Sequence, residues 1–153
     1  MRGFTFIECL LYIALFGISM TGIVSCVYAI KETASRNEAR SALEFEGNFL
    51  LQKIDYEIGT SLSVSTGSGN NTSNSLLIVP RTGALFYFQT ISHKAVRTLG
   101  SSIETISGND VSVDSLTFTQ VNGMVQTKLT LSSNVSHGQV VRETFSNATL
   151  TPL

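Results

Sequence analysis

Residues 3–30 read GFTFIECLLYIALFGISMTGIVSCVYAI, and this stretch decides the fold of the chain. From Cys9 to Ile30 it contains no charged residue. An α-helix over that span is roughly 33 Å long at about 1.5 Å per residue, close to the bilayer hydrocarbon core of about 30 Å. The stretch therefore predicts a membrane-spanning helix, and no proline interrupts it.

One acidic residue, Glu8, stands at the entrance of this apolar segment. A charged side chain inside a bilayer costs at least about 2.5–3.5 kcal/mol on insertion scales, so an intramembrane carboxylate marks a functional position with a partner. The alternative is a Glu8 side chain that reaches the membrane edge and has no partner there.

The hexapeptide Gly3-Phe4-Thr5-Phe6-Ile7-Glu8, followed at once by a long apolar helix, resembles the processing and assembly site of type IV pilins and of type II secretion pseudopilins. The resemblance implies that prepilin peptidase cuts after Gly3, that Phe4 becomes a methylated N-terminus, and that Glu8 serves filament assembly. It implies as partners other pilin or pseudopilin subunits, the peptidase, the inner membrane and the assembly machinery.

Helix geometry fits the role that the resemblance gives to Glu8. Phe4 and Glu8 would lie one turn apart, roughly 6 Å along the axis, and cleavage would create an amine with a reference pKa of about 8. The amine of the same chain or of a neighbouring chain could pair with the carboxylate. Removal of one partner from such a desolvated pair typically costs about 3–5 kcal/mol.

Two other processing routes compete for the same segment. Ile23-Val24-Ser25-Cys26 resembles a lipoprotein box with Cys26 as the lipidated residue, and Val27-Tyr28-Ala29 has the small-residue spacing of a secretory cleavage site. A signal peptide has a basic start and an uncharged apolar region of about 7–15 residues, whereas this segment is longer and opens with an acid. The lipoprotein alternative predicts a singly anchored β-domain that binds a ligand outside the cell.

The two cysteines, Cys9 and Cys26, both lie in the apolar segment, roughly 25 Å apart along a straight helix, so they cannot pair within one chain. The outer part of the chain therefore has no disulfide, and within the pilin resemblance this favours a minor pilin or a pseudopilin. Arg2 precedes the segment, so the positive-inside rule predicts a cytoplasmic N-terminus and a periplasmic or extracellular remainder.

The sequence predicts an α+β fold in which a long N-terminal helix packs on a small antiparallel sheet, as in pilins. The expected organisation is a leader over 1–3, a transmembrane assembly helix over 4–30, an amphipathic helix over 31–58, and an extracytoplasmic β-domain over 59–153. The apolar stripe of the amphipathic part recurs at helical spacings; its members are Ala39, Leu43, Leu50, Ile54 and Ile58. Residues 59–75 are rich in Ser, Thr, Asn and Gly and predict a flexible, exposed connector.

Two hairpins are predicted in the β-domain. Residues 76–79 and 84–90 flank a Pro80-Arg81-Thr82-Gly83 turn, and Asn122-Gly123 is a strong two-residue turn signal. The second hairpin predicts a register in which Val121 faces Met124, and Leu116 faces Leu129 across the strands. Residues 140–145 predict a last strand, and 148–153 a loose or edge-paired tail.

No catalytic constellation or cofactor motif is found. His93 and His137 lack metal-ligand spacing. Asn109, Asp110 and Asp114 lack the ligand pattern of a calcium loop and fit a turn better. With a net charge of −1, nothing suggests direct nucleic-acid binding. The sequence predicts a structural subunit rather than an enzyme.

Overall fold

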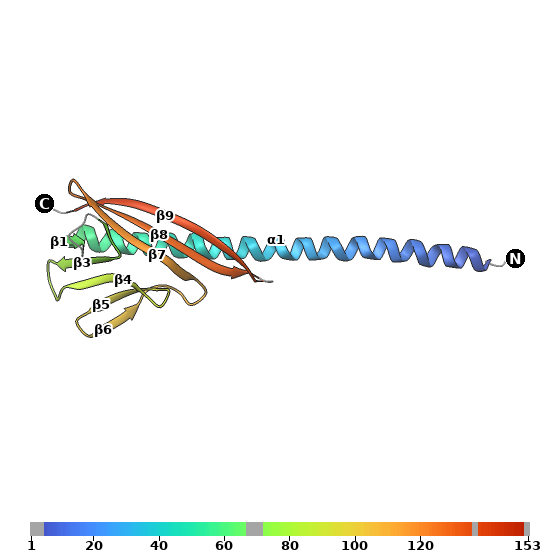
Figure 1. The fold of residues 1–153 in the computed structure, drawn as a ribbon, viewed down its shortest axis with the longest axis horizontal. Helices are drawn as coiled ribbons and strands as arrows, with labels where there is room; N and C mark the ends of the chain where they lie inside the picture. Colours follow the sequence, from blue (N-terminus) through green and yellow to red (C-terminus); the bar gives the residue numbers. More distant parts are fainter. Residues whose placement is uncertain (1–4, 67–71, 136–137, 152–153) are drawn as a thin grey trace. The chain divides into compact units, whose positions relative to one another are not determined.

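The computed structural model describes residues 5–66, 72–135 and 138–151 of the chain. One helix, α1 (Phe6–Thr60), is followed by β-strands only, so the predicted α+β class is confirmed (Figure 1). The chain divides into two compact units, Met1–Asn37 and Glu38–Leu153. The first holds the apolar part of α1, and the second holds the amphipathic part of α1 together with the strands.

The strands form two antiparallel sheets where the sequence predicted one small sheet. The five-stranded sheet has the order β1-β3-β4-β5-β6, and the four-stranded sheet has the order β2-β7-β8-β9. Strands joined by short turns pair with each other, which keeps β3 to β6 in one sheet and β7 to β9 in the other. The strand bounds are β1 (Ser61–Thr66), β2 (Thr72–Ser73), β3 (Ser75–Pro80), β4 (Phe86–Ile91), β5 (Lys94–Leu99), β6 (Ser102–Thr105), β7 (Ser112–Val121), β8 (Met124–Val135) and β9 (Gln139–Leu150).

The Asn122-Gly123 hairpin has the predicted register. Val121 pairs with Met124, and Leu116 pairs with Leu129. Both turn residues have positive φ, 50° at Asn122 and 74° at Gly123, as a type I′ turn requires. The alternation of the two strands therefore puts one side of the hairpin into the core, as the burial of Leu116, Leu129 and Val125 shows.

The core lies between the amphipathic part of α1 and the inner faces of the sheets. All five residues of the predicted stripe are buried, and Gly47 and Leu51 join them. The sheets contribute large buried side chains, chiefly from β3, β4, β7 and β8; they include Leu76, Ile78, Phe86, Phe88, Val113, Phe118 and Leu131. The helical stripe and the period-2 strands thus meet in one hydrophobic cluster.

Gly47 of α1 lies directly against the Phe145 side chain of β9. A Cβ built at this position would lie 2.5 Å from Cε2 of the Phe145 ring. Phe145 itself packs against the core cluster. The missing side chain at Gly47 therefore makes room for an aromatic ring.

The prediction that residues 59–75 form a loop is wrong for most of the described residues of that range, which have regular secondary structure. The helix continues to Thr60, Ser61–Thr66 forms β1, and Thr72–Ser73 forms β2. Strand β1 pairs with β3, and its Val64 is buried, so backbone pairing and one apolar contact outweigh the turn-forming composition. The middle of the predicted connector, 67–71, lies outside the described residues.

The predicted hairpin of residues 76–79 and 84–90 is confirmed as β3 and β4. The predicted last strand over 140–145 is confirmed as part of β9. Leu76 pairs with Phe88 across the Pro80–Gly83 turn region. Strand β9 runs through Leu150 and pairs along β8, so the tail is edge-paired up to that residue. Figure 1 shows β7, β8 and β9 running together beside the amphipathic part of α1.

Candidate functional site

The candidate assembly site is the first turn of α1. The Thr5 carbonyl accepts hydrogen bonds from the backbone N–H of Glu8, at 3.0 Å, and of Cys9, at 3.3 Å. The N–H groups that precede these bonds at the start of a helix have no partner within it, and the helix dipole adds partial positive charge there. The Glu8 carboxylate therefore belongs to the end of the helix that attracts anions. The other two predicted site residues, Gly3 and Phe4, lie outside the described residues.

The position of Glu8 at the start of α1 suits a second role that the motif did not suggest. Helix α1 begins at Phe6, so Thr5 occupies the N-cap position and Glu8 the third helical position. This Thr-x-x-Glu spacing is that of a capping box, in which the acid supports the start of the helix. The spacing was visible in the sequence, and any test of Glu8 must separate this local role from a role between chains.

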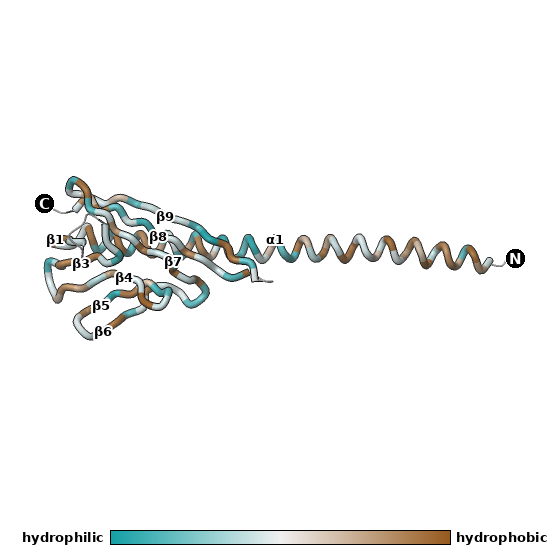
Figure 2. Tube along the Cα trace, viewed as in Figure 1, coloured by the Kyte–Doolittle hydropathy of each residue, from teal (hydrophilic) through white to brown (hydrophobic). Residues whose placement is uncertain are grey.

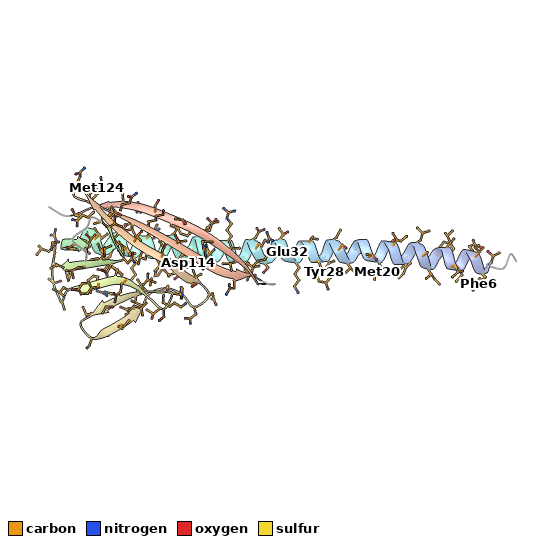
Figure 3. The ribbon with its side chains drawn as sticks, in the orientation of Figure 1. Phe6, Met20, Tyr28, Glu32, Asp114 and Met124 are labelled. Carbon is orange, nitrogen blue, oxygen red and sulfur yellow. The ribbon has the colours of Figure 1, made fainter. Side chains whose placement is uncertain are left out.

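The apolar segment that follows Glu8 is exposed all round within this chain. Every described residue from Thr5 to Ala34 is exposed, among them Phe6 at 81%, Met20 at 49% and Tyr28 at 67%. These three side chains project outward from the helix in Figure 3, and Figure 2 shows apolar residues distributed along this whole part of α1. A helix that is hydrophobic on every side needs lipid or other protein around it. Among the described helices, α1 is long and apolar enough to cross a membrane.

The serine and threonine hydroxyls at residues 19, 21 and 25 of the apolar segment are bonded within the helix itself. Ser19 donates to the Leu15 carbonyl, and Thr21 and Ser25 each donate to the carbonyl four residues earlier, all at 2.9 Å. Such bonds to the i−4 carbonyl satisfy polar side chains without water. Within a bilayer, where an unsatisfied polar group is costly, these residues therefore carry no hydrogen-bond penalty.

Cys9 and Cys26 are both free and exposed thiols. They do not form a disulfide, as their separation predicted. Cys9 lines an apolar hollow of about 400 Å³ together with Tyr12, Ile13 and Phe16.

In the second unit, Asp114 serves a local structural cluster. Its two carboxylate oxygens accept hydrogen bonds from Ser132 Oγ, at 2.7 Å, and Arg142 Nε, at 2.6 Å. The Ser132 hydrogen bond, together with the charge and hydrogen bond of Arg142, lowers the pKa of the Asp114 carboxyl below its ordinary value of 3.8, against an opposing effect of burial. Asp114 therefore ties β7 to β8 and β9 as an anion.

The Asn109-Asp110 segment borders a polar hollow of about 440 Å³, which His93 and Lys94 also line. Lys94 Nζ donates to the backbone carbonyls of Gly108 and, at 3.2 Å, of Val111, which fixes this loop. Among the described residues, no group of three or more His, Cys, Asp or Glu side chains is placed to hold a metal ion. The hollow thus shows no metal-binding arrangement within that part of the chain.

Comparison of the chain with protein-family models, with curated proteins and with solved structures finds no match in any of the three.

Proposed function

We propose that this protein is a structural subunit of a type IV pilus or a type II secretion pseudopilus. Prepilin peptidase would cleave it after Gly3, Phe4 would be N-methylated, and the mature subunit would enter a filament through its N-terminal helix and Glu8. Its partners would be other subunits of the filament and the assembly machinery of the inner membrane. Its role would be structural rather than catalytic.

The observation that carries the proposal is one acid in the first turn of a helix whose next residues are apolar and exposed all round. Lipid can cover this helix in a single subunit, and sister helices can cover it in a filament. Among sister helices Glu8 requires a counter-charge, because a buried, unpaired carboxylate is strongly unfavourable. An N-terminal amine on a neighbouring subunit supplies that charge at the same depth.

The test uses two substitutions of Glu8 that separate charge from helix capping. Glu8→Gln keeps an acceptor suited to the capping box and removes the charge, whereas Glu8→Ala removes both. We expect both variants to be cleaved after Gly3, to stay in the membrane, and to be absent from sheared filaments. Glu32→Ala is the matched control, because Glu32 is an exposed acid of the same helix that pairs with Arg36 at 2.8 Å.

Normal incorporation of Glu8→Gln would refute the proposed counter-charge and leave helix capping as the role of Glu8. Mass spectrometry of the mature protein tests the processing step independently. A methylated Phe4 at the N-terminus supports the proposal, whereas a lipidated Cys26 or an N-terminus after Ala29 contradicts it.

A further inference from the structure

The amphipathic part of α1 carries a second apolar face that the core does not use. Phe45, Phe49 and Tyr56 are exposed at 75%, 45% and 70%, respectively. Their spacings of four and seven residues place them on one side of the helix. We call these three residues the aromatic stripe.

The aromatic stripe points away from the core. Each member lies two residues from a buried one, as Phe45 does from Leu43 and Tyr56 from Ile54. Two residues correspond to about 200° of helix rotation, so the stripe and the core face lie on opposite sides of α1. Gln52, the exposed residue between Phe49 and Tyr56 on this side, is uncharged.

The size of the aromatic stripe indicates what kind of contact it can make. At about 200 Å² for each aromatic side chain, its exposed parts offer roughly 400 Å². A stable interface between soluble proteins buries about 800 Å² on each partner. The stripe is therefore too small to hold two copies together alone, and it fits a contact that forms alongside a larger one.

The chain itself contains a surface of matching chemistry. Cys9, Tyr12, Ile13 and Phe16 line an apolar hollow of about 400 Å³ on the first part of α1. Their spacing of three, four and seven residues is that of a four-residue hole which receives a side chain from a facing helix. None of the residues that define the two surfaces is charged, so packing them together places no ion inside the contact, whereas a charged partner would lose hydration on either surface.

We propose that the aromatic stripe of one copy packs on the apolar hollow at Cys9, Tyr12, Ile13 and Phe16 of a second copy, with Phe45 as the inserted side chain. The inference rests on the proposed assembly through the N-terminal helix, which supplies the larger contact. It adds that the outward face of the amphipathic helix, and not the apolar segment alone, selects the neighbouring subunit.

The native Cys9 makes the contact directly testable. Two copies with different tags are produced together in the same cells. One carries Phe45→Cys with both native cysteines replaced by Ser, and the other keeps Cys9 with Cys26→Ser. Oxidation of sheared filaments should give a disulfide dimer that contains both tags, because subunits shifted along the filament can bring residue 45 of one copy to Cys9 of another. The matched control replaces Phe45→Cys by Leu62→Cys, since Leu62 is an exposed apolar residue at 62% that lies outside the stripe.

A mixed dimer at least about tenfold more abundant with Phe45→Cys than with Leu62→Cys supports the proposal. Equal yields from the two overturn it, because the disulfide would then not depend on a position in the aromatic stripe. A dimer that forms only when the second copy keeps Cys26 in place of Cys9 also overturns it, because the partner surface would be wrong.

Filament incorporation provides the second readout. We expect Phe45→Ser/Tyr56→Ser to lower incorporation about tenfold, with unchanged cleavage and membrane retention, and Leu62→Ser to leave it unchanged. Circular dichroism of the purified full chain verifies that the variants are folded. Normal incorporation of the double variant overturns this inference even if Glu8→Gln fails to assemble, in which case the proposed function stands alone.

Discussion

Replacing Gly47 with Ala should destabilise the protein, although alanine is the better helix former. The exchange gains about 1 kcal/mol of helix propensity at an ordinary helical position. At Gly47 the added Cβ would lie 2.5 Å from the Phe145 ring, whereas carbon atoms in contact are normally about 3.5–4.0 Å apart. The ring must therefore move by about 1 Å, and overpacking of this kind costs about 1–3 kcal/mol.

Gly59→Ala is the matched control in the same helix, because no atom lies within 4 Å of a Cβ added there. Both substitutions exchange glycine for alanine within α1, so their difference reports chiefly the steric cost at Gly47. We expect Gly59→Ala to be neutral or stabilising by up to about 1 kcal/mol. Gly47→Ala should be less stable than Gly59→Ala by about 1–3 kcal/mol.

The assay is urea unfolding of the soluble fragment that begins at Lys31, followed by circular dichroism. Adding Phe145→Leu to Gly47→Ala should recover part of the loss, because the smaller side chain relieves the overlap, and a double-mutant cycle measures this coupling. Equal unfolding free energies for Gly47→Ala and Gly59→Ala would refute the reasoning, since the Phe145 ring would then yield at no cost.

Three other predictions concern the leader, the hairpin and the acidic cluster. Gly3→Leu should leave an uncleaved precursor in the membrane, because the backbone at the cleavage site must approach the peptidase closely and glycine has no side chain to clash there. A mature N-terminus at Phe4, found by N-terminal sequencing, would contradict this. Gly123→Val should lower the unfolding free energy of the fragment by about 1–3 kcal/mol, because a β-branched residue is strained at the positive φ of 74°, and an unchanged urea midpoint would argue against it. Asp114 has a lowered folded-state pKa, so its contribution is present above the ordinary pKa of 3.8 and is lost as the pH falls through the lower folded value. The stability difference between the unmodified fragment and Asp114→Asn should therefore shrink on acidification, whereas a difference that is constant down to about pH 2 would show that Asp114 is not held as an anion.

The sequence predicted those parts of the fold that local pattern controls. The register of the second hairpin followed from Asn122-Gly123 and strict alternation, and the core face of α1 followed from Leu43, Leu50 and Ile54 at helical spacing. Both signals lie within a few residues of the structure that they specify.

The missed elements are those whose stability comes from distant residues. Strand β1 is rich in serine and threonine and is held by its pairing with β3. The β4–β5 turn uses Ser92 and His93 at positive φ, where the sequence offers neither glycine nor asparagine as a signal. The division of the strands into two sheets could not be predicted, because the pattern of a single strand does not show which other strands it pairs with.

The candidate surfaces also fall into those that local sequence predicts and those that depend on packing between distant residues. The motif predicted Glu8 as the assembly residue without any structure, because the residues of the motif are consecutive. The exposure of the aromatic stripe could not be predicted from sequence, because it depends on whether the sheets also cover the side of α1 opposite the core face, and only their packing shows that this side stays exposed. The contact between Gly47 and Phe145 also depends on the packing of β9 against α1.

The bonds that Ser19, Thr21 and Ser25 make to their own helix have a consequence for the reversibility of assembly. These hydroxyls keep the same partners whether lipid chains or neighbouring helices surround them, so a change of surroundings breaks none of these bonds. The exchange then resembles the transfer of a hydrocarbon surface between two media of similar polarity, with little free-energy difference in either direction. In the proposed filament, the bilayer could therefore act as a store from which subunits are drawn and to which they return, while the pairing of Glu8 sets the direction.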